Sequence, residues 1–224
     1  MTIVSHAYKF VFIKTAKTGG TAIETCLSEI LPESDILSPF GREEEGHIAR
    51  NYQNKKGDFR NHMHAQEVIK LLGNDYKDYF YWCVEREPVD KCLSHYAMLK
   101  NSPNHGKNLG ELTWEAYLKR KKFPINSRQY YSRLHKLSFR KQILVDHIID
   151  YHNIRETLPL FLREKFGIQD FNLNKSNAKA GFRDKSIPTI DEVSQEQRKL
   201  IYSKFVVSNK ICREFGINYL LDSI

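Results

Sequence analysis

The segment from Phe10 to Leu31 constrains the fold most, because it joins a strand pattern to a helix pattern through two glycines. Residues 10–13 form a β-branched and aromatic run typical of a buried strand. Gly19 and Gly20 follow, and residues 21–31 then show helical periodicity up to Pro32. A helix that begins at such a turn presents backbone N–H groups and the positive end of its dipole at one point. This segment therefore predicts an anion-binding turn.

Strand and helix patterns alternate along the rest of the chain. We expect strands at 79–84 and 143–149, and helices at 64–72, 88–100, 113–121 and 155–166. One long C-terminal helix is also expected, with Ile201, Phe205, Cys212 and Phe215 on one face and Gly216 at its end. Residues 34–60 and 101–110 are polar and predict surface loops. The alternation predicts a single α/β domain over residues 1–224, with a central, mostly parallel sheet flanked by helices.

Composition limits the class of protein and its ligands. Hydrophobic residues make up 41% of the chain and charged residues 28%, which is typical of a folded globular protein. The 35 Lys and Arg against 27 Asp and Glu leave a formal net charge of +8, which favours anionic ligands.

Localisation is also constrained by the sequence. The cysteines are scattered without a C-x-x-C pair, which favours a reducing compartment. Apolar runs stay well below the roughly 20 residues of a membrane span. The first residues do not resemble a secretory signal, so we expect a cytoplasmic protein without a membrane span.

The turn after the first strand carries the residue types of a phosphate cradle. Its glycines let the backbone approach a phosphate closely, Lys17 adds a mobile cation, and Thr18 and Thr21 add hydroxyl groups. The alternative is a tight turn with a solvated lysine. The turn is not a Walker A loop, because that motif places its lysine after the last glycine.

A second strand-to-helix junction carries an arginine. Arg86 follows the expected strand at 79–84, Pro88 suits the first turn of a helix, and Ser94 lies about two turns further along. Arginine can bind a phosphate through two parallel hydrogen bonds. A helix start stabilised by charge is the alternative interpretation.

The first junction closely resembles the 5′-phosphosulfate loop of sulfotransferases that use 3′-phosphoadenosine 5′-phosphosulfate (PAPS). That loop has a similar Pro-Lys-Thr-Gly-Gly-Thr-Ser sequence after the first strand, and here Ala16 and Ala22 replace the proline and the serine. The resemblance implies that Lys17 contacts the bridging oxygen of the phosphosulfate. It also implies that the 5′ side is held by Thr18, Gly19, Gly20, Thr21 and the Ala22 N–H.

The second junction resembles the 3′-phosphate site of the same family, Arg-x-Pro-x-x-Arg-x-x-Ser-x-Tyr. Matching residues at these spacings are Arg86, Pro88, Ser94 and Tyr96, while Lys91 replaces the second arginine. The resemblance implies that Arg86 and Ser94 hold the 3′-phosphate. Lys91 keeps the charge but lacks the planar guanidinium.

A histidine near the expected helix at 64–72 is a candidate general base. The segment 61–73 resembles the family's His-x-x-Ala-x-Glu helix, which makes His62 the candidate base and His64 the second choice. Both could instead be a surface pair or a helix cap. A metal site at His-x-His has no evident third ligand.

Two further segments resemble this family. Residues 145–153 resemble its third strand and following turn, although His152 stands where the family often has Glu. Residues 171–177 look like its Asn-Lys-Ser segment, with Arg183 nearby, so Lys175 and Arg183 are candidates to close over the nucleotide. Solvated basic residues on a loop are the alternative.

The resemblance implies an enzyme with an α/β architecture like that of P-loop nucleotide-binding proteins. It would transfer a sulfuryl group in line from PAPS to a hydroxyl acceptor such as a carbohydrate or a small alcohol. The nucleotide product would be adenosine 3′,5′-bisphosphate (PAP), and the reaction would need no metal ion. We expect no nucleic-acid partner, and the motifs specify neither the acceptor nor the oligomeric state. Acceptor contacts are expected from residues 34–60 and 101–125.

Two other classes of function stay open. A kinase or NTPase would need a magnesium-binding Ser or Thr after the loop lysine, which Thr18 could supply, and an acid at a strand end, which no hydrophobic run convincingly provides. A non-catalytic polyanion-binding protein is compatible with the net charge, but no helix presents a basic face with interleaved aromatic residues.

Overall fold

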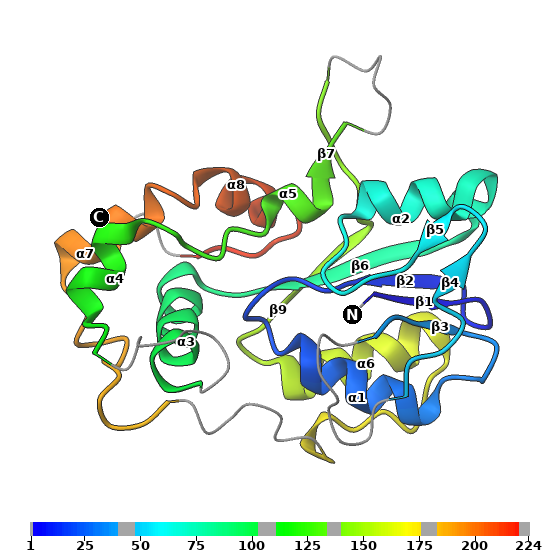
Figure 1. The fold of residues 1–224 in the computed structure, drawn as a ribbon, viewed down its shortest axis with the longest axis horizontal. Coiled ribbons are helices and arrows are strands. Elements are labelled where there is room, and N and C mark those ends of the chain that lie inside the picture. The colour runs from blue at the N-terminus through cyan, green and yellow to red at the C-terminus, as the bar shows by residue number, and fades with distance from the viewer. Residues whose placement is uncertain (1, 40–47, 103–110, 134–139, 176–182, 220–224) are drawn as a thin grey trace. The chain divides into compact units, whose positions relative to one another are not determined.

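The computed structural model describes residues 2–39, 48–102, 111–133, 140–175 and 183–219 (Figure 1). The chain divides into two compact units. The first comprises Met1–Glu85 and Asn126–Asn177, and the second comprises Arg86–Ile125 and Ala178–Ile224. The expectation of one domain over residues 1–224 stays a prediction.

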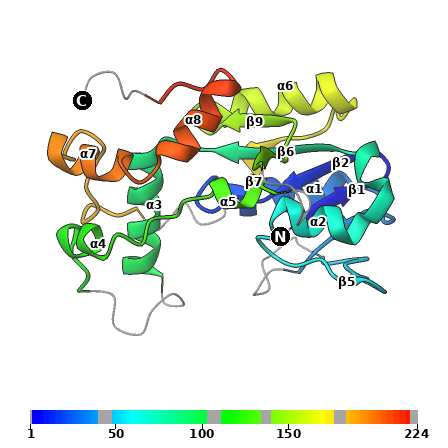
Figure 2. The same cartoon turned by 90° about the horizontal axis from the view of Figure 1, so that it is seen from above.

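A five-stranded sheet forms the centre of the first unit within the described residues. Its strands, in spatial order, are β3 (Ile36–Leu37), β1 (Ile3–Ser5), β2 (Phe10–Ile13), β6 (Phe80–Glu85) and β9 (His147–Asp150). β2 is parallel to β6 and β6 to β9, whereas β1 is antiparallel to both of its neighbours. Figure 2 shows β1, β2, β6 and β9 side by side. The sheet is mixed and mostly parallel, which confirms the predicted α/β class.

Helices cover both faces of this sheet. α1 (Gly20–Ile30) and α6 (Ile154–Phe166) lie on one face and α2 (Ala65–Leu72) on the other (Figure 1). The short helix α5 (Ser127–Tyr130) packs against α2. The core beneath α1 and α6 combines aliphatic side chains with aromatic rings, among them Phe12 and Trp82, whose ring centroids are 4.4 Å apart. The part of the unit that the structure describes also contains the 3₁₀ helices η1 (Gly73–Asp78) and η2 (Leu173–Lys175). Its hairpin strands are β4 (Gln53–Asn54), β5 (Gly57–Asp58), β7 (Tyr131–Ser132) and β8 (Gln142–Ile143).

The second unit is built from helices. Those in its described residues are α3 (Pro88–Asn101), α4 (Trp114–Arg120), α7 (Gln195–Tyr202) and α8 (Val206–Glu214). α4 joins α3 through buried aromatic rings, with Trp114 5.4 Å from Tyr96 between centroids. The Trp114 indole also donates a hydrogen bond of 3.1 Å to Gln197 on α7. These contacts hold α3, α4 and α7 together.

The predicted strand at 143–149 is wrong in its extent. Only β9 joins the central sheet, whereas β8 pairs with β7. Asp146 separates them, because its carboxylate accepts the Tyr81 N–H at 2.7 Å and so replaces a strand carbonyl as the partner of β6. A side chain that takes over one ladder bond changes the course of the backbone at that residue.

The predicted long C-terminal helix is also wrong. α7 ends at Tyr202 and α8 begins at Val206, with a tight turn in which the Phe205 N–H bonds the Tyr202 carbonyl at 3.0 Å. Phe205 is buried at this turn. Burial of this side chain outweighs the continued helical periodicity of the sequence.

The segment 34–60 is less irregular than expected. It contributes β3, β4 and β5, and Asp35 and Phe59 within it are buried. Residues 40–47 lie outside the described residues, as do residues 103–110 of the other expected loop. None of the helices in the described ranges is long and apolar enough to cross a membrane.

Candidate active site

The turn between β2 and α1 is held by its own hydroxyl groups. Thr15 Oγ1 donates to the Val84 carbonyl on β6, and Thr18 Oγ1 donates to the Thr15 carbonyl at 3.1 Å. Both threonines are buried. The Thr18 hydroxyl therefore stabilises the turn from within.

The two glycines of the turn are required by its packing. Gly19 has φ of 74°, and a Cβ there would lie 3.0 Å from the Tyr151 ring. A Cβ on Gly20 would lie 2.8 Å from Lys14 Cγ. Internal contacts thus explain both glycines, so the potential to bind an anion rests on the first amides of α1 and on the partly buried Lys17.

A buried ion pair lies beneath the turn. Lys14 Nζ contacts Glu24 Oε2 of α1 at 2.6 Å, with side-chain exposures of 5% and 0%. Burial raises the pKa of Glu24, and the Lys14 ammonium opposes that rise. Lys14 Nζ also lies 3.5 Å from Thr21 Oγ1, so the pair ties the end of β2 to the first turns of α1.

We expect Lys14→Met to lower the free energy of unfolding by about 3–5 kcal/mol, because it leaves a buried carboxylate without its partner. Urea unfolding at neutral pH would measure this. Since folded Glu24 keeps its proton to higher pH than the unfolded chain does, the deficit should shrink as pH falls toward 4.5.

An exposed ion pair in the same unit provides the control. Arg60 and Glu67 are 3.2 Å apart, with side-chain exposures of 69% and 42%. Arg60→Met should cost less than about 1 kcal/mol. Equal losses in the two variants would contradict a structural role for the buried pair.

His62 lies against the same turn. Its Nδ1 is 3.2 Å from the carbonyl oxygen of Lys14, the first residue after β2. A carbonyl oxygen only accepts, so this bond requires a hydrogen on Nδ1. In the neutral ring the lone pair is then on Nε2, the form that a general base needs.

Lys17 and His62 share an uncommon backbone conformation. Their φ angles are 65° and 55°, in the left-handed region that residues other than glycine seldom adopt. Such strain costs on the order of 1–3 kcal/mol per residue and concentrates at functional sites. Three further residues among those described, Lys9, Asn51 and Lys121, also have positive φ, so the conformation is compatible with a functional role but does not define one.

His64, the second candidate base, occupies the N-cap of α2. Its backbone N–H donates to Glu67 Oε2 at 3.0 Å. The helix-cap interpretation therefore describes His64, whereas it does not describe His62.

The second unit contains an arginine pair at the start of α3. Arg86 Nε contacts Asp90 Oδ2 at 2.5 Å, and Arg183 Nη2 contacts Asp90 Oδ1 at 2.6 Å. Burial would raise the pKa of Asp90, but Arg86 and then Arg183 hold it below its usual value. The Arg86 contact is made through its Nε. One carboxylate thus brings together two of the predicted nucleotide-binding residues.

Other predicted residues lie on α3. Ser94, partly buried, is one helical turn from Asp90 and shares its face. Lys91 is fully buried, with its Nζ 5.8 Å from the centroid of the Phe205 ring. Lys175 ends η2 in the first unit, whereas Arg183 belongs to the second.

Strand β6 ends in a buried acid. Glu85 is 1% exposed, and Tyr130 donates to its Oε1 at 3.1 Å. β6 neighbours β2 in the sheet, so this carboxylate ends the strand next to the one that leads into the turn. The sequence patterns indicate no hydrophobic run that ends convincingly in the acid a kinase or NTPase requires, and so they miss Glu85.

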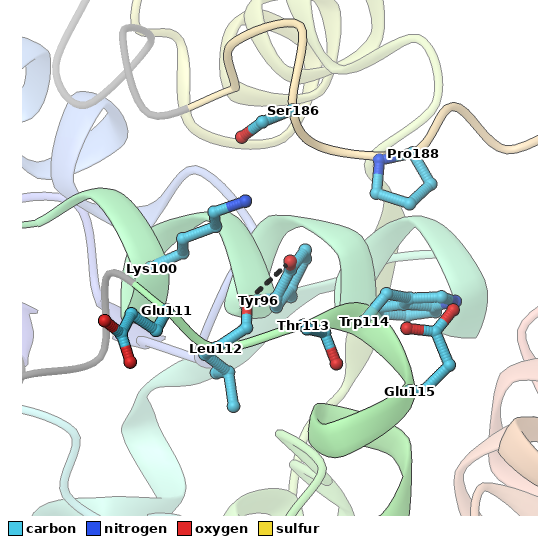
Figure 3. A pocket seen from close by; sticks show the side chains of 9 residues that line it. All are labelled: Tyr96, Lys100, Glu111, Leu112, Thr113, Trp114, Glu115, Ser186 and Pro188. Carbon is cyan, nitrogen blue, oxygen red and sulfur yellow. Dashed lines mark hydrogen bonds between the residues drawn. The ribbon is translucent and has the colours of Figure 1, made fainter.

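A cavity of about 400 Å³ lies within the second unit (Figure 3). Its lining includes Lys100, Glu111, Thr113, Glu115 and Ser186, together with Tyr96 and Trp114. Both aromatic residues are at least 95% buried, so little of either is exposed. Its charges are of both signs and do not indicate one class of ligand.

The sequence patterns missed several residues of the site. Asp90 has a readable signal, because a carboxylate four residues after Arg86 on a helix is a usual partner. The Lys14 and Glu24 pair, Asn126 and Gln129 have no local signal. Across the described ranges, no group of three His, Cys, Asp or Glu side chains is arranged to hold a metal ion.

A scan against protein-family models, a search of curated proteins and a search of solved structures each found no match to this chain. The resemblance of residues 12–22 and 86–96 to sulfotransferase motifs therefore stands on those residues alone.

Proposed function

We propose that this protein is a PAPS-dependent sulfotransferase with a P-loop-like nucleotide site. The observation that carries the proposal is the contact of His62 with Lys14, at the base of the turn that contains Lys17. A candidate base and a candidate phosphate loop, suggested by separate sequence motifs, thus meet in one unit of the fold.

In this proposal the turn after β2 binds the 5′-phosphosulfate. The first amides of α1 and the helix dipole favour the anion, and Lys17 neutralises charge on the leaving phosphate oxygen. Arg86 binds the 3′-phosphate, with Ser94 as a second donor and Arg183, which contacts the same Asp90 carboxylate, nearby.

The reaction is a single displacement at sulfur. The bond between sulfur and the bridging phosphate oxygen breaks as the acceptor oxygen forms a new bond to sulfur, and His62 Nε2 takes the acceptor proton. The electron pair of the broken bond stays on the former bridging oxygen, which becomes a negatively charged oxygen of the 5′-phosphate of PAP. No protein side chain becomes covalently modified. The protein contributes by orienting the donor and the acceptor and by excluding water.

We expect PAP to bind with a dissociation constant of about 10 μM or lower in EDTA, because protein cations and amides neutralise both phosphates without a metal. Isothermal titration calorimetry would measure this. Binding that appears only when magnesium is added would contradict the proposal.

The kinase alternative gains one observation, the buried Glu85 at the end of β6. A thermal-shift comparison separates the classes, since a ligand that binds only the folded state raises the melting temperature. PAP alone should raise it for a sulfotransferase, ATP with magnesium for a kinase, and heparin alone for a polyanion-binding protein.

The acceptor class is open to direct screening. Incubation with ³⁵S-labelled PAPS and panels of carbohydrates and small alcohols would identify a labelled product. Heat-denatured protein is the blank. A panel that yields label in none of these hydroxyl compounds, while PAP binds, would exclude them as acceptors.

A further inference from the structure

Helix α5 and the residue before it contact the turn after β2, His62 and the end of β6. Asn126 accepts from the Ala16 N–H at 3.1 Å and donates to the Ala16 carbonyl at 3.0 Å. At the other end of the helix, Tyr130 donates to Glu85. These side chains are at least 97% buried, so an unpaired group here would cost about 1–3 kcal/mol. α5 is therefore held to the turn and to the end of β6.

Gln129 on this helix connects the turn to His62. Its Nε2 donates to the Lys14 carbonyl at 3.0 Å and to the His62 carbonyl at 3.2 Å, which uses both amide hydrogens. The Lys14 carbonyl is also the acceptor of the His62 ring. One oxygen thus receives Gln129 and His62 together, and Gln129 also binds the backbone of His62.

The contact with Gln129 bears on the backbone conformation of His62. Its φ of 55° is unfavourable for a β-substituted residue, and strain of this kind persists only where surrounding contacts enforce it. Gln129 supplies such a contact at the His62 carbonyl. Without it, relaxation of the His62 backbone would move the ring away from the Lys14 carbonyl.

We propose that Gln129 is a positioning residue that holds His62 as the Nδ1–H tautomer against the phosphate loop. This inference rests on the proposed function, in which Nε2 accepts the proton of the acceptor. Gln129 is 9% exposed and acts through His62 and Lys14. The Nδ1 bond keeps the lone pair on Nε2, so loss of Gln129 lowers the fraction of protein whose base is in the reactive form.

The first test is spectroscopic and does not depend on activity. Histidine ¹⁵N-labelled protein would show His62 mainly as the Nδ1–H tautomer, assigned with His62→Ala. In Gln129→Met the signal should shift toward the Nε2–H tautomer. Ser132→Ala is the matched control, because Ser132 follows the same helix but bonds Gln66 on α2. An unchanged His62 signal in Gln129→Met would overturn the inference.

The second test is kinetic. With an acceptor from the screen, Gln129→Met should lower kcat roughly 10-fold while the PAP dissociation constant changes less than about twofold. The same substitution should have no further effect on a protein that already carries His62→Ala, because coupled residues are not additive. A full additional loss in the double variant would overturn the inference.

If Gln129→Met does not fold, Gln129→Glu replaces it, since the carboxylate has the same length but lacks the two amide hydrogens. Failure of the wild type to bind PAP would overturn the proposed function. A tautomer shift in that case would still establish that Gln129 positions His62.

Discussion

His62→Ala should lower turnover by about 100-fold or more and leave the affinity for PAPS nearly unchanged, because a general base acts on the acceptor. The Nδ1 contact with Lys14 places the His62 ring beside the turn. The expected loss of turnover reflects the loss of proton transfer from the acceptor. Steady-state kinetics with the screened acceptor and calorimetry with PAP would measure the two effects. A loss of PAP affinity as large as the loss of turnover would assign His62 to nucleotide binding.

His64→Ala is the internal control. His64 is exposed like His62 and two residues away, but it lies at the N-cap of α2, where its backbone N–H bonds Glu67. Its removal should leave kcat within about threefold of the wild type. If His64→Ala is the inactive variant, the alignment of this segment with the family motif is wrong.

Arg86→Ala should weaken PAP binding about 10- to 100-fold, because hydrogen bonds between charged groups contribute about 1.5–3 kcal/mol. Adenosine 5′-phosphosulfate lacks the 3′-phosphate, so its affinity should change less than about threefold. Calorimetric titration of both ligands into both proteins tests the assignment. Equal losses for the two nucleotides would remove Arg86 from the 3′-phosphate site.

Arg163→Ala controls for charge in this comparison. Arg163 is an exposed residue in the last turn of α6, and its removal changes the net charge by the same amount. PAP affinity should stay within about twofold of the wild type at physiological ionic strength, where distant surface charges are screened. A loss comparable with that of Arg86→Ala would indicate a general electrostatic effect.

Local patterns located the elements that surround the predicted site. β2 has the predicted bounds, α2 begins one residue later than expected, and α6 begins one residue earlier. Each has a buried run or a helical period together with a terminating glycine or a sharp change in composition. These signals lie within the element itself, so the sequence is sufficient to place it.

Long-range contacts decided the elements that were mispredicted. The run at 143–149 has strand character throughout, but Asp146 bonds Tyr81, which is 65 residues away. The break between α7 and α8 follows the burial of Phe205, whose ring lies near Lys91 of α3 and Phe123, both far from it in the sequence. In both cases a tertiary contact outweighs a local preference of a few tenths of a kcal/mol per residue.

The sequence by itself determined the α/β class and placed the strand, turn and helix on which the proposed nucleotide site is built. Only the tertiary structure decided which residues support them. Gln129 meets Lys14 across 115 residues, and Asn126 meets Ala16 across 110. The periodicity of hydrophobic residues indicates which side chains are buried, but a buried polar side chain is satisfied by whichever partner the fold brings to it. That partner has no signature in the local sequence.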